Sequence, residues 1–302
     1  MSGASGPRRV LLVGGSGGLV GRSVLPEFLP DFRVRSLHRS PVPAEEVAEV
    51  DWVAGDLGRL SDWAPVLDQV DVVVNLAWYR YGNARRFRRL YEGLGRLLQA
   101  SRDAGVRRFL HVSVPDAPPG LERGLPYLSY KRAFDRDLEA SGLSYRILRP
   151  TMLFGRNDRL LGVMLRLMHR YRRFPMFGSG EYHVSPVAVE DLARALRLEA
   201  DRTEVGTVDV GGPERMRYRE LTDRMFAALG QAPRYWTFSP RVSIAIGQLV
   251  QDLGSSLLYA YEVEWLMSDR LGPAPYEGLD RPLRRVDPYL RQEAQRLVER
   301  SA

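Results

Sequence analysis

A tyrosine and a lysine four residues apart are the first candidates for chemistry in this sequence. They are Tyr127 and Lys131 in the stretch PYLSYKRAF, and Lys131 is the only lysine among 44 basic residues. Side chains at this spacing share one face of a helix. A nearby ammonium favours the phenolate form of tyrosine, whose ordinary pKa is near 10, and brings it into the range of acid–base catalysis. The pair therefore predicts a proton-transfer site.

Chance offers a second explanation for the same pair. With 14 tyrosines in 302 residues, a lysine has a tyrosine four positions upstream about 14/302 of the time, roughly one in twenty. Arginine replaces lysine well on a solvated surface, so a bias towards arginine codons would leave few lysines. Arginine replaces it poorly where a compact ammonium must tune a neighbour's pKa or hold a ribose. The pair alone leaves both explanations open.

A glycine loop near the start of the chain predicts a phosphate site. In VLLVGGSGGLVGRSV, Gly15, Gly18 and Gly21 follow an apolar strand and open a helix. Such glycines allow a tight turn and a close approach of the backbone to a pyrophosphate, which the helix N-terminus stabilises. A glycine-rich turn without a ligand is the alternative, but the strand–loop–helix context favours a dinucleotide site.

The end of the second expected strand bears on which dinucleotide is bound. An acidic residue there would bind the adenosine ribose hydroxyls and favour NAD. The sequence instead reads SLHRS, and Arg39 can pair with the 2′-phosphate of NADP. We therefore expect NADP(H) to be preferred over NAD(H), although arginine is also common on the surface of this chain.

The elements that must position these residues alternate along the first half of the chain. Short β-rich runs (RRVLLVGG, FRVRSLHR, VDWVAGDL, DVVVNLAW, RRFLHVSV and SYRILRP) are separated by amphipathic segments such as NARRFRRLYEGLGRLLQASRDAG and YLSYKRAFDRDLEASG. This rhythm predicts βαβ units and a parallel sheet buried on both faces. The right-handed crossover rule makes the fold class α/β, a Rossmann-type doubly wound sheet.

The rhythm changes after Pro150, which predicts a smaller, mostly helical C-terminal lobe. A helix is expected in DRLLGVMLRLMHRYRRF, an extended piece and a helix in YHVSPVAVEDLARALRLEA, a strand in GTVDVGG and a helix in RYRELTDRMFAALG. The remainder reads as helical with proline-rich breaks. We expect residues 1–158, with 184–212, to form the NAD(P)-binding domain, and 159–183 with 213–302 to form the lobe.

Composition and charge restrict the remaining possibilities. The chain has no cysteine, and its four histidines show no ligand spacing, so no metal site is expected. Net charge is +7, with basic clusters at 85–89 and 169–173, but no nucleic-acid recognition motif is present. The first residues lack the apolar segment of a signal peptide, and no run is long and apolar enough to cross a bilayer. These features predict a cytoplasmic protein.

The motifs now occur in one order: the glycine loop, Arg39, GDL, NLA, HVSV, YxxxK and LRP. This order resembles the extended and atypical short-chain dehydrogenase/reductase superfamily over the whole chain. The resemblance is closest to the NAD(P)-binding group that includes the dinucleotide-binding accessory subunit of respiratory complex I. SPVAVEDLARAL and DVGGPERMRYREL match the C-terminal half of that group.

The resemblance implies roles for individual residues. Tyr127 would be the general acid–base, Lys131 would hold the nicotinamide ribose, and Ser113 would position the substrate oxygen. The cofactor would be bound by Gly15, Ser16, Gly17, Gly18, Leu19, Val20, Arg39, Asp56, Leu57, Leu76, Ala77, Lys131 and Pro150.

The sequence departs from the catalytic members at the end of the fifth strand. These members carry a second small hydroxyl residue there, whereas HVSVPD places Val114 after Ser113. Ser113 therefore serves the substrate or is structural. The Asp-Glu pair of the sugar-nucleotide dehydratases is also missing, which argues against dehydration. In WYRYGN, the residues 78–81 would either overhang the nicotinamide or pack against the lobe.

Two functions remain for the chain. The first is an NADP(H)-dependent oxidoreductase or epimerase that moves a hydride between nicotinamide and a carbonyl or alcohol of unknown identity. The second is a catalytically weak or inactive protein that binds NADP(H) as a structural or sensing ligand in a larger or membrane-associated assembly. Two of the expected helices could form a homodimer face, although packing on the sheet explains their periodicity equally well.

Overall fold

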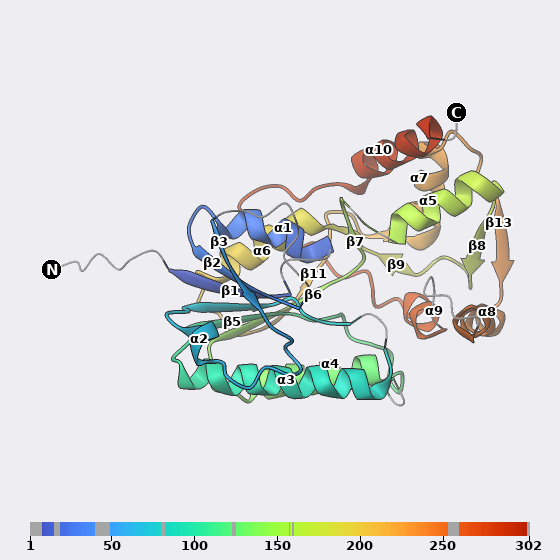
Figure 1. The fold of residues 1–302 in the computed structure, drawn as a ribbon. Coiled ribbons are helices and arrows are strands. Elements are labelled where there is room, and N and C mark those ends of the chain that lie inside the picture. Colours follow the sequence, from blue (N-terminus) through green and yellow to red (C-terminus); the bar gives the residue numbers. More distant parts are fainter. Residues whose placement is uncertain are drawn as a thin grey trace. The chain divides into compact units, whose positions relative to one another are not determined.

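The computed structural model describes residues 8–14, 19–39, 49–79, 82–122, 125–156, 158, 160–252 and 260–300. The chain forms two compact units (Figure 1). Unit 1 consists of Met1–Val114, Glu122–Arg149 and Val189–Val208, and unit 2 of Pro115–Leu121, Pro150–Ala188 and Asp209–Ala302. The domain boundaries expected from the sequence stay a prediction.

Unit 1 is built on a seven-stranded sheet in the order β11-β6-β5-β4-β1-β2-β3. Every registered pairing from β3 across to β6 is parallel. The strands are β1 (Arg9–Val13), β2 (Arg33–His38), β3 (Val50–Ala54), β4 (Val72–Asn75), β5 (Arg108–Val112), β6 (Tyr145–Pro150) and β11 (Gly206–Val210). The prediction of a Rossmann-type doubly wound parallel sheet is confirmed.

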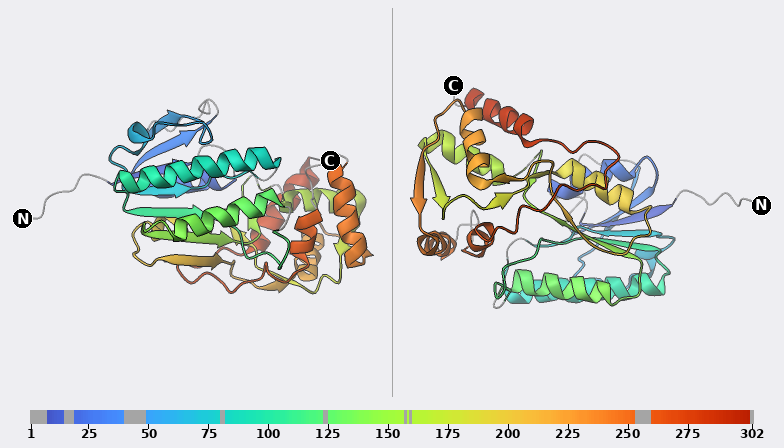
Figure 2. Two further views of the ribbon diagram at one scale, coloured as in Figure 1. Left: turned by 90° about the horizontal axis from the view of Figure 1, so that it is seen from below. Right: turned by 180° about the vertical axis from the view of Figure 1, so that it is seen from behind.

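Helices cover both faces of this sheet (Figures 1 and 2). On one face lie α1 (Leu19–Phe28) and α6 (Val189–Glu199); on the other lie α3 (Ala84–Asp103) and α4 (Pro126–Glu139), with the short α2 (Ala64–Leu67). The central strand β4 is apolar on both faces because Val72, Val73 and Val74 are all fully buried. The helices on both faces hold the strands in place, so that the parallel strands end along one edge of the sheet.

Local sequence signals hold α3 and α4 in place. The Asn83 side chain caps α3 by accepting the backbone N–H of Arg86 at 3.0 Å. Gly105, with a φ of +70°, ends that helix in the left-handed region. Pro126 stands at the start of α4, where its missing N–H is not needed. Pro126 therefore marks where α4 begins, directly before Tyr127.

The strand order places a switch point at the carboxyl edge of the sheet. The chain passes from β1 to β2 on one side, while β4 lies on the other side of β1. In doubly wound sheets, ligands bind outside the carboxyl ends of the strands at such a switch point. The segments that leave this edge are Gly14, residues 76–79 and residues 113–114.

Unit 2 has its own core, formed mainly by α5 (Leu160–Tyr171), α7 (Tyr218–Ala228) and α10 (Val286–Glu299). Two further helices are α8 (Pro240–Asp252) and α9 (Ala260–Leu266). Three strand pairs complete the unit: β7 (Leu153–Phe154) with β10 (Val187–Ala188), β9 (His183–Val184) with β12 (Met216–Arg217), and β8 (Phe174–Phe177) with β13 (Tyr235–Phe238).

The sequence-based expectation for this unit was wrong at β8 and β13. The expected helix through Phe174 ends at Tyr171, because Arg172 adopts a φ of +55° that a helix cannot continue. The expected helical remainder also contains a strand. The segment YWTF is too short to show a period, and its partner FPMF lies about sixty residues earlier in the chain. In the part of the chain that the structure describes, no helix combines the length and the hydropathy required to span a bilayer.

Candidate active site

Lys131 is buried in unit 1, on the face of α4 that packs against the sheet. Only 3% of its surface is exposed, and its ammonium donates to the carbonyl oxygen of Val112 at 3.0 Å. The nitrogen also lies 4.4 Å from the centre of the Trp78 ring, a cation–π contact. Burial lowers the pKa of Lys131 to about 7, although the carboxylate of Asp135 opposes this shift. The amine can therefore gain or lose a proton near neutral pH.

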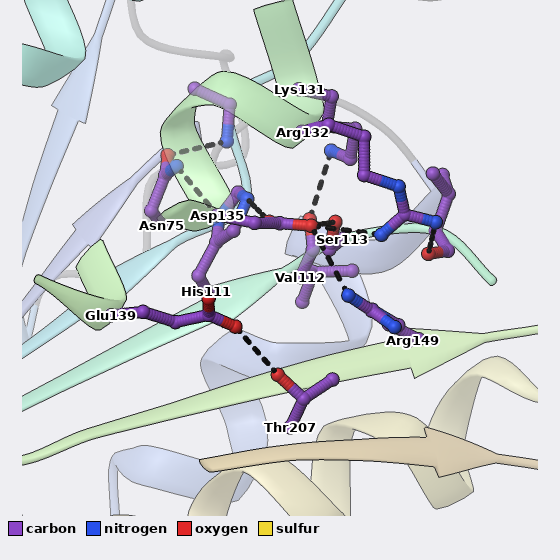
Figure 3. Close-up of polar contacts among 12 residues, drawn as sticks. Asn75, His111, Val112, Ser113, Lys131, Arg132, Asp135, Glu139, Arg149 and Thr207 are labelled. Atoms are coloured by element: carbon purple, nitrogen blue, oxygen red, sulfur yellow. Dashed lines mark hydrogen bonds and ion pairs between the residues drawn. The ribbon is translucent and has the colours of Figure 1, made fainter. Parts of the chain in front are cut away.

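Asp135 is the centre of a buried polar network beneath the end of β5 (Figure 3). Its Oδ2 accepts hydrogen bonds from the Ser113 hydroxyl at 2.7 Å and from the Arg132 guanidinium at 3.0 Å. A guanidinium nitrogen of Arg149 lies 3.8 Å from the same oxygen. Because this carboxylate is 2% exposed, its pairing with two guanidinium groups offsets the cost of burying its charge.

His111 connects this network to the end of β4. The side-chain nitrogen of Asn75 lies 3.0 Å from Nδ1 of His111, while the amide oxygen of Asn75 accepts the backbone N–H of Ala77 at 3.1 Å. The Asn75 NH₂ group therefore donates to Nδ1, which leaves the ring proton on Nε2, 3.5 Å from Oδ1 of Asp135. Burial first, and then the charge of Lys131, lower the pKa of His111 well below 6.5, so the ring is neutral.

Ser113 takes part in the network rather than standing apart from it. Its hydroxyl donates a hydrogen bond to the carboxylate of Asp135, and the residue is 3% exposed. The next residue, Val114, uses its carbonyl oxygen to accept from Arg132 at 3.1 Å. Ser113 therefore helps to hold α4 against β5. That Ser113 positions the substrate oxygen stays a prediction. Its hydroxyl oxygen can still accept a hydrogen bond while it donates to Asp135.

Tyr127 lies in the first turn of α4, one turn before Lys131 and two turns before Asp135. This spacing of i, i+4 and i+8 places the three residues on one side of the helix. The Tyr127 ring is partly buried and packs edge-to-face on Phe87 of α3, with 6.0 Å between ring centres. The predicted pair is thus carried by one helix face that the sheet and α3 together hold in place.

Arg39 reaches across the end of β1. Its guanidinium donates to the hydroxyl of Tyr79 at 3.0 Å, and a second guanidinium, from Arg86, stacks 3.8 Å from the centre of the Tyr79 ring. Arg39 follows β2 and Tyr79 follows β4, and β1 lies between these two strands. The contact therefore spans the switch point. Both arginines are exposed, so they offer two cations to an anion at this edge.

The backbones that leave β1 and β4 approach each other closely. Gly14 has a φ of +82°, and a Cβ on it would lie 2.9 Å from the Cα of Ala77. The N–H of Leu76 donates to the carbonyl oxygen of Val13 at 2.9 Å. Only glycine suits both the conformation and the space at position 14. Leu76 and Ala77 therefore lie beside Gly14 at the carboxyl edge of the sheet, and their contact with a cofactor stays a prediction.

The other expected cofactor residues have simpler surroundings. Leu19 and Val20 open α1, and Pro150 ends β6. Leu57 is buried, while the Asp56 carboxylate accepts the N–H of Gly58 within its own turn at 2.9 Å. Gly15, Ser16, Gly17 and Gly18, like Arg80 and Tyr81, lie outside the described residues.

The residues at this edge fit a dinucleotide. The carboxyl edge of the sheet carries arginine cations near β2 and a buried ammonium near β5, and the bordering backbone between them is made of small residues, Gly14 and Ala77. An elongated ligand with phosphates and hydroxyl groups needs cations and close backbone approach in this arrangement.

Comparison with known proteins agrees with this assignment. A family described as NAD(P)H-binding matches residues 14–171, just over half of the chain. The chain belongs to this family. The resemblance to the extended short-chain dehydrogenase/reductase superfamily is likewise confirmed. These findings establish NAD(P) binding as the common property of the family and leave the preferred dinucleotide open.

Two of the relatives differ in kind: one is a subunit of a larger enzyme and the other is a reductase. The chain is 28% identical over 179 residues to the mitochondrial NADH dehydrogenase [ubiquinone] 1 alpha subcomplex subunit 9 of Arabidopsis thaliana, covering 56% of this chain and 43% of the subunit. It is 24% identical over 255 residues to a 2-alkyl-3-oxoalkanoate reductase of Stenotrophomonas maltophilia, covering 74% and 76%. The chain thus spans less than half the length of the plant subunit.

Among solved structures, a nucleoside-diphosphate-sugar epimerase from Staphylococcus aureus shares the fold. The TM-score is 0.75, the identity is 14%, and the match covers 94% of this chain and 99% of the epimerase. At this identity the likeness concerns the fold.

Proposed function

We propose that the protein is an NADP(H)-dependent oxidoreductase that moves a hydride between nicotinamide and a carbonyl or alcohol. The observation that carries the proposal is the only lysine of the chain, buried one helical turn after Tyr127 with its pKa lowered to about 7. Burying a lysine costs free energy. A lysine that served only as a surface charge would remain in water, so its burial indicates another role. Perturbed groups of this kind gather at functional sites.

The residues divide the work of the reaction. Bound nicotinamide supplies or accepts the hydride. Tyr127 gives its hydroxyl proton to the substrate oxygen during reduction and takes it back during oxidation. Lys131, in its charged form, favours the phenolate that remains, and its two N–H groups not used by Val112 can hold ribose hydroxyls. Asp135 favours that charged form.

The preference for NADP(H) is proposed from the end of β2. Arg39 stands where a carboxylate would bind the ribose hydroxyls of NAD, and its guanidinium can pair with a 2′-phosphate instead. Arg86, stacked on the same Tyr79 ring, adds a second cation to this edge of the sheet. The two together support recognition of a dianionic group.

A carbonyl substrate is supported by the reductase relative, whose name specifies a 3-oxoalkanoate. Reduction of a ketone needs one hydride and one proton, which are the two species that this site is proposed to deliver. For this chain we propose the same class, a carbonyl or the corresponding alcohol.

A second candidate function follows from Ser113. Its hydroxyl is held by Asp135, and Val114 occupies the position where catalytic members carry another hydroxyl. The relative named as a subunit of NADH dehydrogenase [ubiquinone] supports a place in an assembly, where we propose as the alternative that this chain binds the cofactor without turnover. Such a protein would gain stability from NADPH and show no reductase activity.

The deciding experiment measures binding and turnover separately. NADPH and NADH are titrated by nicotinamide fluorescence, and NADPH consumption is then followed with a panel of 3-oxo acids and other ketones. Tyr127→Phe is expected to bind NADPH within about threefold of wild type and to lose about 100-fold or more in turnover. Tyr130→Phe, on the same helix, is the matched control and should keep full activity.

Two results would overturn the oxidoreductase proposal. If Tyr127→Phe keeps its turnover, the proton comes from another group. If wild type binds NADPH tightly but turns over no member of the panel, the cofactor-binding alternative is supported.

A further inference from the structure

Unit 2 carries an exposed surface that is both apolar and basic. It consists of residues 160–178 and 231–250, which contain α5, β8, β13 and α8 as far as Val250, two residues before the Asp252 that ends the helix, and is here named the basic–apolar surface. Four of the six large hydrophobic side chains that stand exposed in the described residues lie on it. They are Tyr171, Trp236, Val242 and Leu249, with 54%, 43%, 46% and 59% of their surface exposed. Apolar exposure of this kind indicates an interaction site.

The charge of the same two segments is one-sided. They contain no Asp or Glu, whereas 37 acidic residues in 302 would give about five in a stretch of 39. They contain six arginines, all exposed: Arg166, Arg170, Arg172, Arg173, Arg234 and Arg241. The exposed apolar side chains and the acid-free segments therefore coincide, and the coincidence points to a partner that is both anionic and apolar.

The segments are contiguous in space. β8 and β13 pair in parallel, with Trp236 opposite Pro175, and the N–H of Phe174 donates to the carbonyl oxygen of Arg234 at 3.0 Å. Trp236 and Pro175 thus share one face of the strand pair. The ring of Tyr235 takes the opposite face, since its hydroxyl lies 2.9 Å from that of Thr222 on α7.

α8 follows directly at the carboxyl end of β13 (Figure 1). The N–H of Gly178, which follows β8, donates to the carbonyl oxygen of Phe238 at 3.0 Å and to the hydroxyl of Ser243 at 3.3 Å. These bonds attach the first turn of α8 to the strand pair. Arg172, Arg173 and Arg234 therefore stand before the amino ends of the two strands, and α8, with Arg241 in its first turn, follows at the carboxyl end.

The helix α8 has two apolar sides. One packs against α9, because Ser243 and Gly247 are buried and a Cβ at Gly247 would lie 2.8 Å from the Cα of Ala260. The other side is exposed and carries Val242, Ala245 and Leu249, at the i, i+3 and i+7 spacing of one helix stripe. The first side explains how α8 is held in unit 2, and the second has a composition suited to hydrocarbon.

We propose that the basic–apolar surface binds the surface of an anionic lipid bilayer, with α8 lying in the interface. Val242 and Leu249 would enter the boundary between headgroups and acyl chains, and Trp236 suits the headgroup level. The arginines next to the strand pair and in α8, such as Arg172, Arg173 and Arg241, would reach the lipid phosphates, each contributing about 1 kcal/mol near an anionic membrane. A nucleic acid would neutralise the arginines but would not bury the aliphatic side chains, so the bilayer is the better fit.

The test is sedimentation of the full chain with vesicles, at low and high salt. Binding is expected to vesicles of phosphatidylcholine with about one-third phosphatidylglycerol, to weaken at high salt, and to be absent with phosphatidylcholine alone. The double variant Val242→Glu, Leu249→Glu should lose binding at least tenfold. Val298→Glu is the matched control, because Val298 is also 46% exposed but lies on α10. It should bind like wild type.

Fluorescence provides a second measurement. Lipids brominated in the acyl chains should quench part of the tryptophan emission, and Trp236→Phe should remove that part. If the double variant does not fold, as judged by circular dichroism, Arg172→Gln, Arg173→Gln replaces it and should weaken binding severalfold. The proposal is overturned if wild type ignores the anionic vesicles or if the folded variants bind as well as wild type. Self-association that Val242→Glu abolishes, without vesicle binding, would instead assign the surface to a second copy of the chain.

Discussion

Replacing the buried lysine should stabilise the protein, and by an amount that depends on pH. Lys131 has a pKa of about 7 in the folded chain, against 10.5 for an ordinary lysine. Between these values the unfolded chain holds a proton that the folded chain does not, so stability rises with pH across this window and is lost as pH falls towards 7. A shift of about 3.5 units corresponds to roughly 5 kcal/mol over the whole window. Lys131→Met keeps an unbranched side chain that is one atom shorter, and it removes this cost.

The assay is urea unfolding of wild type and variant at several pH values. Lys131→Met leaves the Val112 carbonyl without its donor, which costs about 1 kcal/mol at every pH. The advantage of the variant should therefore be largest at pH 7 and below, and shrink by roughly 2.5 kcal/mol between pH 7.5 and 9.5. Arg136→Met, an exposed charge on the same helix, is the control, and its effect should not vary with pH. A constant difference for Lys131→Met would refute the lowered pKa.

Three further changes test separate parts of the account. Gly14→Ala should destabilise by about 2–4 kcal/mol in urea unfolding, because its Cβ would meet Ala77. Gly105→Ala, with a similar φ but open space, should cost only about 1 kcal/mol, and equal costs would contradict the close approach. Asp135→Asn should destabilise by about 3–5 kcal/mol by the same measurement. It should also lower the pKa of Lys131 in an NMR titration, and an unchanged pKa would contradict the interaction between Asp135 and the lysine. Arg39→Ala should weaken NADPH binding about tenfold or more and leave NADH binding within about twofold; equal losses would argue against a 2′-phosphate contact.

The fold of unit 1 could be predicted because each strand carries its own signal. Runs such as VVV in β4 are short, apolar and β-branched, and α3 shows an unbroken helical period that ends at Gly105. The glycine loop and YxxxK then follow from spacing alone. β13 escaped prediction because four residues carry no period, and because its pairing with β8 depends on contacts about sixty positions away in the chain.

The network around Asp135 could not be read from the sequence. A charged residue on a helix is usually solvated, and nothing in KRAFD indicates burial beside two arginines. The available signal was weak: Asp135 continues the spacing of Tyr127 and Lys131, and His111 interrupts an apolar strand. Whether such polar residues are buried depends on the sheet that covers them, which is a property of the whole fold.

The most direct test of the central claim uses the fact that Lys131 is the only lysine. Protein labelled with ¹³C at the lysine ε-carbon gives one side-chain signal for this residue. Saturating NADPH is predicted to move that signal and to raise its pKa above about 7, because ribose hydroxyls would accept from the ammonium and the phosphates would favour its charge. A signal that stays in place while NADPH is bound would contradict a cofactor site that includes Lys131.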